Sequence, residues 1–304
     1  MHSPLAPWNH PAAAAAGVRL YVKRDDLLTP APGTALQGNK VRKLGGILTA
    51  ALEQREPPVL ASFGGAYSNH LSALATAGRL FSIPIVLYVR GEEADNAVLT
   101  RARADGAHLI PLSRTEYRMK GQAEWLAARS SDLAQAYQRP AEQIWWLPEG
   151  GTTAESALQT GALYPEIVND LHGQVPDFLC LSAGTGGTAA GVIAAAQPPT
   201  RIEVFPALKG DWMSASIRAL LPNPDQGNWS LITDYHFGGY GKFPEAWRMA
   251  SPGIATRAAL PEPGLPPLEP IYTAKLFFGV LDRLRRRVYP AGSTVVIIHS
   301  GGIY

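Results

Sequence analysis

The segment Gln37-Gly38-Asn39-Lys40-Val41-Arg42-Lys43-Leu44-Gly45 decides the fold of this 304-residue chain. Gly38-Asn39 forms turns readily, and the residues after this pair favour a helix. Asn39 itself fits a cap at the start of that helix. The segment therefore predicts a helix with Lys40 in its first turn and with one apolar face, made by Val41, Leu44, Leu48, Ala51 and Leu52.

Short apolar runs alternate with amphipathic segments along the rest of the chain. The runs are apolar throughout, as in strands of a sheet that is covered on both faces. Strands that alternate with helices form parallel sheets with right-handed crossovers. The predicted fold class is therefore α/β, with mostly parallel sheets flanked by helices, and the predicted strands are 59–62, 83–89, 108–112, 144–147, 178–182, 202–205 and 294–298.

Two glycine-rich segments directly follow predicted strands. They are Phe63-Gly64-Gly65-Ala66-Tyr67-Ser68-Asn69-His70 and Ser182-Ala183-Gly184-Thr185-Gly186-Gly187-Thr188. Ligands of parallel sheets bind outside the carboxyl ends of the strands, which is where both segments fall. A fixed amine, a serine at a loop-to-helix junction and a phosphate cradle are what a pyridoxal phosphate enzyme needs, because this cofactor forms a Schiff base with lysine and its phosphate needs N–H donors.

The candidate Schiff-base lysine is Lys40. Burial and neighbouring cations lower the pKa of a lysine and free its amine. Lys43, one helical turn further on, is the nearest alternative, and both could instead be exposed helix lysines. Lys23 and Lys275 are expected to be structural or surface residues.

The second glycine-rich segment is the candidate phosphate site. A strand leads in and an alanine-rich helix leads out, so backbone N–H groups and the helix dipole point at an anion. Its predicted cofactor-binding residues are Gly184, Thr185, Gly186, Gly187 and Thr188. An alternative is a dinucleotide fingerprint made by Gly184, Gly186 and Ala189 with Glu203 as the ribose ligand. This alternative gives Lys40 and Ser68 no role, and Glu203 lies within the next strand rather than clearly at its end.

Composition and charge exclude several other classes of function. The net charge of +2 predicts no nucleic-acid partner, and the basic run 285–287 fits a solvated helix end. Cys180 is the single cysteine and lies in an apolar run, so no disulfide, no cysteine metal cage and a buried thiol are expected. The N-terminus lacks signal-peptide features, and no run of about 18 apolar residues occurs. These features predict a cytosolic protein with no membrane span and no metal site.

Eight motifs in one order resemble the 1-aminocyclopropane-1-carboxylate deaminase / D-cysteine desulfhydrase family, within the tryptophan synthase β-like (fold type II) pyridoxal phosphate enzymes. Together they cover nearly the whole chain. They are Val22-Lys23-Arg24-Asp25-Asp26-Leu27, Gly38 to Leu44, Gly64 to His70, Pro148-Glu149-Gly150-Gly151, Gly184 to Gly191, Phe237-Gly238-Gly239-Tyr240-Gly241, Glu269 to Lys275, and His299-Ser300-Gly301-Gly302.

The resemblance implies two domains and a homodimer. Residues 1–50 and 150–304 would form a larger cofactor-binding domain, residues 51–149 a smaller inserted one, and pyridoxal 5'-phosphate would lie between them. Relatives commonly extend past the last motif by a short tail, whereas this chain ends at Tyr304.

The resemblance also implies roles for individual residues. Lys40 corresponds to the family's cofactor lysine, Ser68 to its catalytic acid/base and Asn69 to a residue that hydrogen-bonds the ring hydroxyl of the cofactor. Ser68 also fits a plain helix cap, and the start of its helix, with Asn69 and His70, is expected to bind the substrate carboxylate. Tyr240 and Tyr272 correspond to active-site tyrosines.

Two predicted cofactor-binding residues, Thr273 and Ser300, depart from the deaminase pattern. Thr273, or a near neighbour, is expected beside the pyridine nitrogen, where deaminases carry glutamate, and Ser300 stands where they carry leucine. A neutral partner makes the ring a weaker electron sink. We therefore expect a lyase that eliminates a good β-leaving group from a small amino acid, as D-cysteine desulfhydrase does. The alternatives are ring opening of 1-aminocyclopropane-1-carboxylate and a non-catalytic amino-acid-binding protein.

Overall fold

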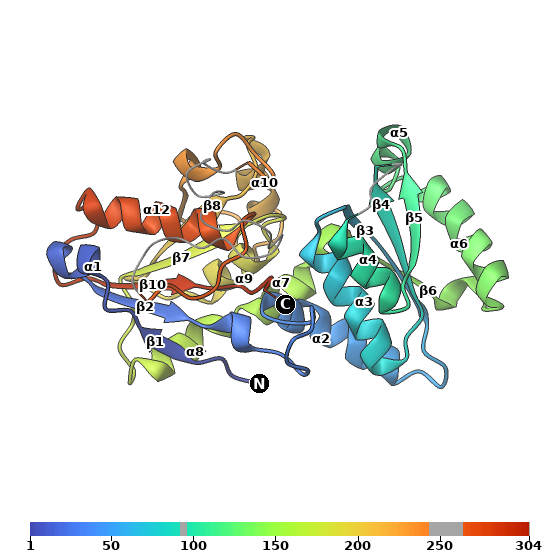
Figure 1. Cartoon of the computed structure of the whole chain (residues 1–304), viewed down its shortest axis with the longest axis horizontal. Helices are drawn as coiled ribbons and strands as arrows, with labels where there is room; N and C mark the ends of the chain where they lie inside the picture. The colour runs from blue at the N-terminus through green and yellow to red at the C-terminus, as the bar shows by residue number, and fades with distance from the viewer. Residues whose placement is uncertain (92–95, 243–263, 304) are drawn as a thin grey trace. The chain divides into compact units, whose positions relative to one another are not determined.

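The computed structural model describes residues 1–91, 96–242 and 264–303, which belong to two compact units (Figure 1). Unit 1 comprises Met1–Pro30, Gln37–Lys43 and Thr153–Tyr304, and unit 2 comprises Ala31–Leu36 and Leu44–Thr152. The division expected from the sequence differs from these bounds mainly at residues 31–36 and 44–50, which belong to unit 2.

Unit 1 is built, within the described residues, on a six-stranded sheet in the order β1-β2-β10-β7-β8-β9. The pair β1 and β2 is antiparallel, and the other neighbouring pairs are parallel. The strands are β1 (Leu5–Pro7), β2 (Arg19–Lys23), β7 (Phe178–Ala183), β8 (Arg201–Pro206), β9 (Trp229–Leu231) and β10 (Thr294–Ile298).

Helices cover both faces of this sheet. In β10, Val295 and Ile297 pack with one set of helices, whereas Val296 and Ile298 pack with the other. Because alternate residues face opposite sides of a strand, a strand buried on both faces is apolar throughout. The first set is α1 (Pro11–Ala16) and α12 (Thr273–Arg285), and the second is α7 (Ala154–Thr160), α8 (Leu163–Asp170), α9 (Gly187–Ala195) and α10 (Trp212–Arg218). Two 3₁₀ turns, η1 (Asp25–Leu27) and η4 (Thr233–Tyr235), complete the described elements of this unit.

Unit 2 contains, in the part that the structure describes, a parallel four-stranded sheet in the order β5-β4-β3-β6. On one face an aromatic cluster that includes Phe63, Tyr88 and Trp146 packs against residues of α5 and α6. Its elements are β3 (Val59–Gly65), α3 (Asn69–Phe81), β4 (Ile85–Arg90), α4 (Ala97–Ala104), β5 (His108–Leu112), α5 (Arg114–Arg118), α6 (Ala123–Tyr137), β6 (Ile144–Leu147) and the 3₁₀ turns η2 (Ala141–Gln143) and η3 (Glu149–Gly151).

The predicted lysine-bearing helix is α2 (Asn39–Leu52). Its first five residues belong to unit 1 and the others to unit 2. Leu44, Leu48 and Ala51 are buried as predicted, but Leu52 is 47% exposed. That part of the prediction is wrong because Leu52 is the last residue of the helix, where the chain turns into an exposed loop.

All seven predicted strands are present, whereas β1, β2 and β9 have no counterpart among the predictions. In β2, Leu20 and Val22 are buried, but Arg19 and Lys23 at its ends hide the apolar pattern. β1 contains Pro7 and lies at the edge of the sheet, where proline is tolerated. In residues 1–91, 96–242 and 264–303, no helix has both the length and the hydropathy needed to cross a membrane.

Replacing Gly191 with Ala is expected to destabilise unit 1. A Cβ atom at this position of α9 would overlap with the carbonyl oxygen of Ala157 in α7, which is backbone and cannot rotate away. Overpacking of this kind costs about 1–3 kcal/mol. Gly45→Ala is the matched control, because a Cβ there meets nothing within 4 Å. Urea unfolding of both variants measures the difference, and equal stability would contradict the tight α7–α9 contact.

Candidate active site

The turn before Lys40 is locked onto the loop that follows β10. Gly38 has a φ of +62°, and a Cβ atom there would overlap with the carbonyl oxygen of Ser300. The N–H of Asn39 donates to that same carbonyl oxygen at 3.1 Å. Only glycine combines this left-handed conformation with so close an approach. Ser300, predicted as a cofactor ligand, therefore lies directly against the start of α2.

The side chain of Asn39 joins the lysine segment to the glycine-rich segment of unit 1. Its Nδ2 atom donates to Thr188 Oγ1 at 3.0 Å, and Thr188 lies in the first turn of α9. The sequence predicts only a helix cap for Asn39, because nothing local indicates a partner 149 residues away. The contact brings the first turns of α2 and α9 together, which the two motifs alone do not reveal.

The glycines of the segment 184–188 are required by close packing. Gly186 has a φ of +84°, and a Cβ atom there would lie 3.0 Å from Ile217 Cγ1. A Cβ atom on Gly184 would lie 2.9 Å from Tyr272 Cε1. The segment leads from β7 directly into α9, whose first N–H groups have no intrahelical acceptor and so favour an anion.

The surroundings of Lys40 favour the neutral form of its amine. Its side chain is partly exposed, and burial lowers its pKa to about 8. Lys43 is only 3% exposed, and burial together with the charge of Lys40 lowers its pKa well below the usual value. Both lysines thus carry a neutral amine more readily than a lysine in water. Lys40 differs from Lys43 because it directly follows Asn39, whose contacts with Ser300 and Thr188 fix the start of the helix.

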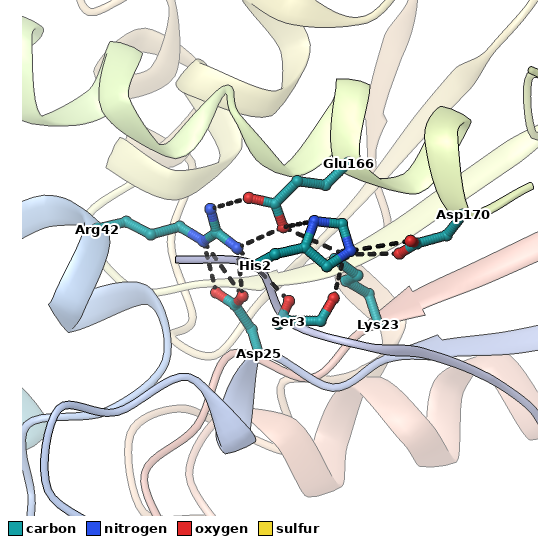
Figure 2. Close-up of polar contacts among 7 residues, drawn as sticks. All are labelled: His2, Ser3, Lys23, Asp25, Arg42, Glu166 and Asp170. Carbon is teal, nitrogen blue, oxygen red and sulfur yellow. Dashed lines mark hydrogen bonds and ion pairs between the residues drawn. The ribbon is translucent and has the colours of Figure 1, made fainter.

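Arg42, two residues after Lys40, anchors the first turn of α2 (Figure 2). Its guanidinium donates to Asp25 Oδ1 at 2.7 Å and to Glu166 Oε1 at 2.7 Å. Asp25 is fully buried in η1, and Glu166 is on α8. A planar guanidinium with two carboxylates fixes both distance and orientation. The start of α2 is therefore tied to two other elements of unit 1.

Further charges complete this network (Figure 2). Lys23, which is fully buried, lies 3.1 Å from Glu166 Oε2 and 2.9 Å from Asp170 Oδ2. His2 Nε2 lies 2.9 Å from Asp170 Oδ1. Burial raises the pKa of Glu166, but the hydrogen bonds and charges of Arg42 and Lys23 outweigh it, and the net pKa lies below 4.5. Lys23 is thus structural, as predicted.

The predicted tyrosines lie together in unit 1. The rings of Tyr240 and Tyr272 are 6.3 Å apart at 69°, in an edge-on arrangement. Tyr272 also lies against Gly184 of the candidate phosphate segment, where the absence of a Cβ atom makes room for its ring. The structure therefore brings Tyr240, Tyr272 and the glycine-rich segment into one neighbourhood.

A buried carboxylate that the sequence does not single out fixes the backbone of Tyr272. Glu269 is 3% exposed and accepts hydrogen bonds from the N–H groups of Ile271, Tyr272 and Thr273 at 2.6–2.8 Å. Burial raises the pKa of Glu269, while these N–H groups act in the opposite direction. Thr273 is fully buried, and its Oγ1 atom accepts from Glu269 N at 3.0 Å. Its contact with a pyridine nitrogen stays a prediction.

Three of the predicted residues belong to unit 2. Ser68 caps α3, with its Oγ atom accepting from Leu71 N at 3.4 Å. Asn69 is the first residue of that helix. His70 is buried, and its Nε2 atom lies 2.7 Å from Ser62 Oγ. The cap is confirmed; the catalytic and substrate-binding roles of these residues stay predictions.

The dinucleotide alternative fails on the position of Glu203. This residue lies within β8, is 5% exposed, and pairs with Arg283 at 2.5 Å and with the Tyr289 hydroxyl at 2.8 Å. A carboxylate that is buried and paired in this way cannot bind a ribose. Cys180 is fully buried beside the same group, as the apolar run predicts.

Comparisons with known proteins identify the family. The model of the family described as "Pyridoxal-phosphate dependent enzyme" matches residues 3–228. The D-cysteine desulfhydrase of Klebsiella pneumoniae (strain MGH 78578) is 25% identical over 94% of this chain and 87% of its own. The bifunctional D-cysteine desulfhydrase/1-aminocyclopropane-1-carboxylate deaminase of Arabidopsis thaliana mitochondria is 29% identical over 62% of this chain and 48% of its own.

A solved structure of an ACC deaminase homologue has the same fold, with a TM-score of 0.75, 23% identity, and coverage of 100% of this chain and 90% of that one. The chain belongs to the pyridoxal-phosphate-dependent enzymes. The resemblance to the 1-aminocyclopropane-1-carboxylate deaminase / D-cysteine desulfhydrase family, the fold type II class and the cofactor are thereby confirmed, and the chain is a pyridoxal-phosphate-dependent lyase.

The residues that the structure brings together in unit 1 fit this cofactor. The segment 184–188 leads from β7 directly into α9, so the first N–H groups of that helix could bind a dianionic phosphate. Lys40, whose pKa is lowered to about 8, would hold the aldehyde carbon. Asn39 links these two parts directly.

Replacing Lys40 with Ala is expected to abolish covalent attachment of pyridoxal phosphate, because the attacking amine is removed. Borohydride reduction followed by peptide mapping measures which lysine carries the cofactor. Lys43→Ala is the matched control and is expected to keep the attachment on Lys40. Reduced cofactor found on another lysine of the Lys40→Ala variant at wild-type yield would sink the assignment.

Replacing Arg42 with Met is expected to lower the free energy of unfolding by about 3–5 kcal/mol at neutral pH, because buried carboxylates lose their partner. Arg42 helps to hold the pKa of Glu166 below 4.5, so this stabilisation is present above that pH and is lost as the pH falls through the folded pKa. The difference in the free energy of unfolding between Arg42→Met and wild type is therefore expected to be smaller at acidic pH. Urea unfolding at neutral and acidic pH measures both effects.

Arg286→Met provides the control for this prediction. The side chain of Arg286 is 65% exposed and lies 3.6 Å from Asp282, so its loss is expected to cost no more than about 1 kcal/mol. An equal effect of the two substitutions would contradict the anchoring role of Arg42.

Proposed function

We propose that this lyase catalyses α,β-elimination from a small amino acid with a good β-leaving group, with D-cysteine as the best candidate. With water, D-cysteine would give pyruvate, ammonia and sulfide. The observation that carries the choice is the pair Thr273 and Ser300, two neutral hydroxyl residues where the deaminases have glutamate and leucine. The names of the relatives support both this activity and the alternative, ring opening of 1-aminocyclopropane-1-carboxylate.

The residues of unit 1 would hold the cofactor and move protons. The N–H groups at the start of α9 would bind its phosphate, and Lys40 would hold it and then exchange a proton with the substrate α-carbon. Tyr240 and Tyr272, whose rings lie edge-on to each other, would deliver or accept a proton through a phenol hydroxyl. Pyridoxal phosphate, when bound, supplies the electron sink for the α-carbon.

Ser68 and Asn69 would act on the substrate from the start of α3. A helix N-terminus attracts a carboxylate, and the Ser68 hydroxyl can exchange a proton with the substrate. A cap and a catalytic group are compatible, because Oγ can accept from Leu71 N while its own proton is directed elsewhere. The homodimer, the cytosolic location and substrate contacts of His70 also stay predictions.

The choice of substrate is tested by kcat/KM for D-cysteine and for 1-aminocyclopropane-1-carboxylate. Wild type is expected to prefer D-cysteine, because loss of a thiolate demands less of the ring than breaking a carbon–carbon bond. Thr273→Glu/Ser300→Leu is expected to shift the ratio toward the cyclopropane substrate. The single Ser300→Leu variant is measured beside the double variant. It avoids a glutamate at position 273, which would lie close to the Glu269 carboxylate. Wild-type preference for the cyclopropane substrate would overturn the proposal.

Replacing Ser68 with Ala is expected to lower turnover by about 10²–10⁴-fold while the cofactor stays bound, as for a lost acid/base group. Loss of the cap adds a destabilisation of up to about 2 kcal/mol. Ser113→Ala is the matched control, because Ser113 caps α5 in the same unit with the same kind of Oγ acceptor. If both variants lose stability but neither loses turnover, Ser68 is only a cap.

A further inference from the structure

Lys275, in the first turn of α12, carries a buried ammonium group. Its side chain is 2% exposed. The Nζ atom donates to the carbonyl oxygens of Ala207 at 2.8 Å, His236 at 3.0 Å and Gly239 at 2.8 Å. An ammonium group has three N–H donors, so these carbonyl groups satisfy it completely. Lys23 differs in that two carboxylates, besides the carbonyl oxygen of Ser3, surround its Nζ atom.

The acceptors lie on segments that reach the predicted tyrosines. Ala207 directly follows β8, and Gly239 directly precedes Tyr240. Lys275 itself stands three residues after Tyr272, whose ring contacts that of Tyr240. The ammonium group therefore ties the backbone beside Tyr240 to the helix that begins beside Tyr272.

The loop that carries Tyr240, residues 237–241, has a conformation that regular secondary structure does not maintain. Phe237, Gly238, Gly239 and Gly241 all have positive φ, with +126° at Gly239. The carbonyl oxygen of His236 also accepts from Gly239 N, and that of Gly239 from Lys242 N. The second lone pair of each of these oxygens faces the ammonium group. Without a cation, these converging carbonyl dipoles would repel one another.

We propose that Lys275 is a positioning residue whose ammonium group acts as an internal monovalent cation, fixing the loop 237–241 and so holding Tyr240 against Tyr272. Backbone carbonyl oxygens can replace the hydration shell of K⁺ in the same manner. A side chain that ends in an ammonium group occupies such a site whatever the salt. Burial lowers the pKa of Lys275 to about 8, so the group is mostly charged at neutral pH. The positioning of Tyr240 rests on the proposed function, whereas the cation site itself does not.

The first test is thermal melting of the holoenzyme in KCl, NaCl and choline chloride at equal ionic strength. Lys275→Ala opens the carbonyl site to a free ion, and its Tm is expected to rise with K⁺ but not with choline. Lys275→Met fills the space with an uncharged side chain, and in wild type the lysine ammonium group already occupies the site. The Tm of neither protein is therefore expected to respond specifically to K⁺. An Ala variant whose Tm is no more sensitive to K⁺ than that of the Met variant would overturn the cation site.

The second test is kcat/KM, measured well below the Tm of every variant, with wild type in the same assay. Misplacement of a reacting group by about 1 Å costs about 10²-fold, so both variants are expected to lose activity on this scale. K⁺ is expected to restore the Ala variant alone. The activity of wild type in the same assay tests the proposed substrate independently of the Lys275 variants. Variants with a lowered Tm but wild-type kcat/KM would show that Lys275 only stabilises the fold.

Reductive methylation of the wild-type holoenzyme keeps the proposal testable if neither variant folds. Lys275 is expected to stay unmodified while Lys209, which is exposed near the same loop, is methylated. Mass spectrometry of peptides measures both rates. Equal modification of the two lysines would show that the ammonium group is not held by the carbonyl oxygens.

Discussion

The ion pairs of Arg42 with Asp25 and Glu166 are the constraint on which the candidate cofactor site depends. They fix the first turn of α2, and the position of Lys40 follows from that turn. The desolvation of buried charges makes such pairs weak contributors to net stability, but their geometry is specific. Arg42 therefore sets where the helix begins, and Asn39 and Gly38 then meet Thr188 and Ser300.

The order of strands in unit 1 explains why these residues meet. β2, β10, β7 and β8 are consecutive neighbours and run parallel. Their carboxyl ends lead, in that order, to Asp25, Ser300, Gly184 and Ala207. Residues that are far apart in the sequence thus share one edge of the sheet, which is the edge where parallel sheets bind ligands.

Local patterns in the sequence predict the parts of this structure that local chemistry determines. Strands such as β10 are buried on both faces and appear as apolar runs, and glycines with positive φ, such as Gly186, stand out beside a helix. The strand β2 is missed because its terminal Lys23 is buried through partners on α8, which no local pattern contains. Glu269 is missed for the same reason, since its acceptor role depends on a turn that only the folded chain shows.

The lysines of unit 1 differ in whether their surroundings leave the amine free to react. Lys23 lies between carboxylates, which favour its charge, and Lys275 lies among carbonyl oxygens, which use all of its donors. Each is held in one place and has no freedom to attack a ligand. Burial lowers the pKa of both Lys275 and Lys40 to about 8, but Lys40 is partly exposed whereas Lys275 is buried. A nucleophile needs this combination of a neutral amine and an accessible position. The motif Gly38-Asn39-Lys40 makes Lys40 the candidate from sequence, because glycine and asparagine build the turn at the start of the helix.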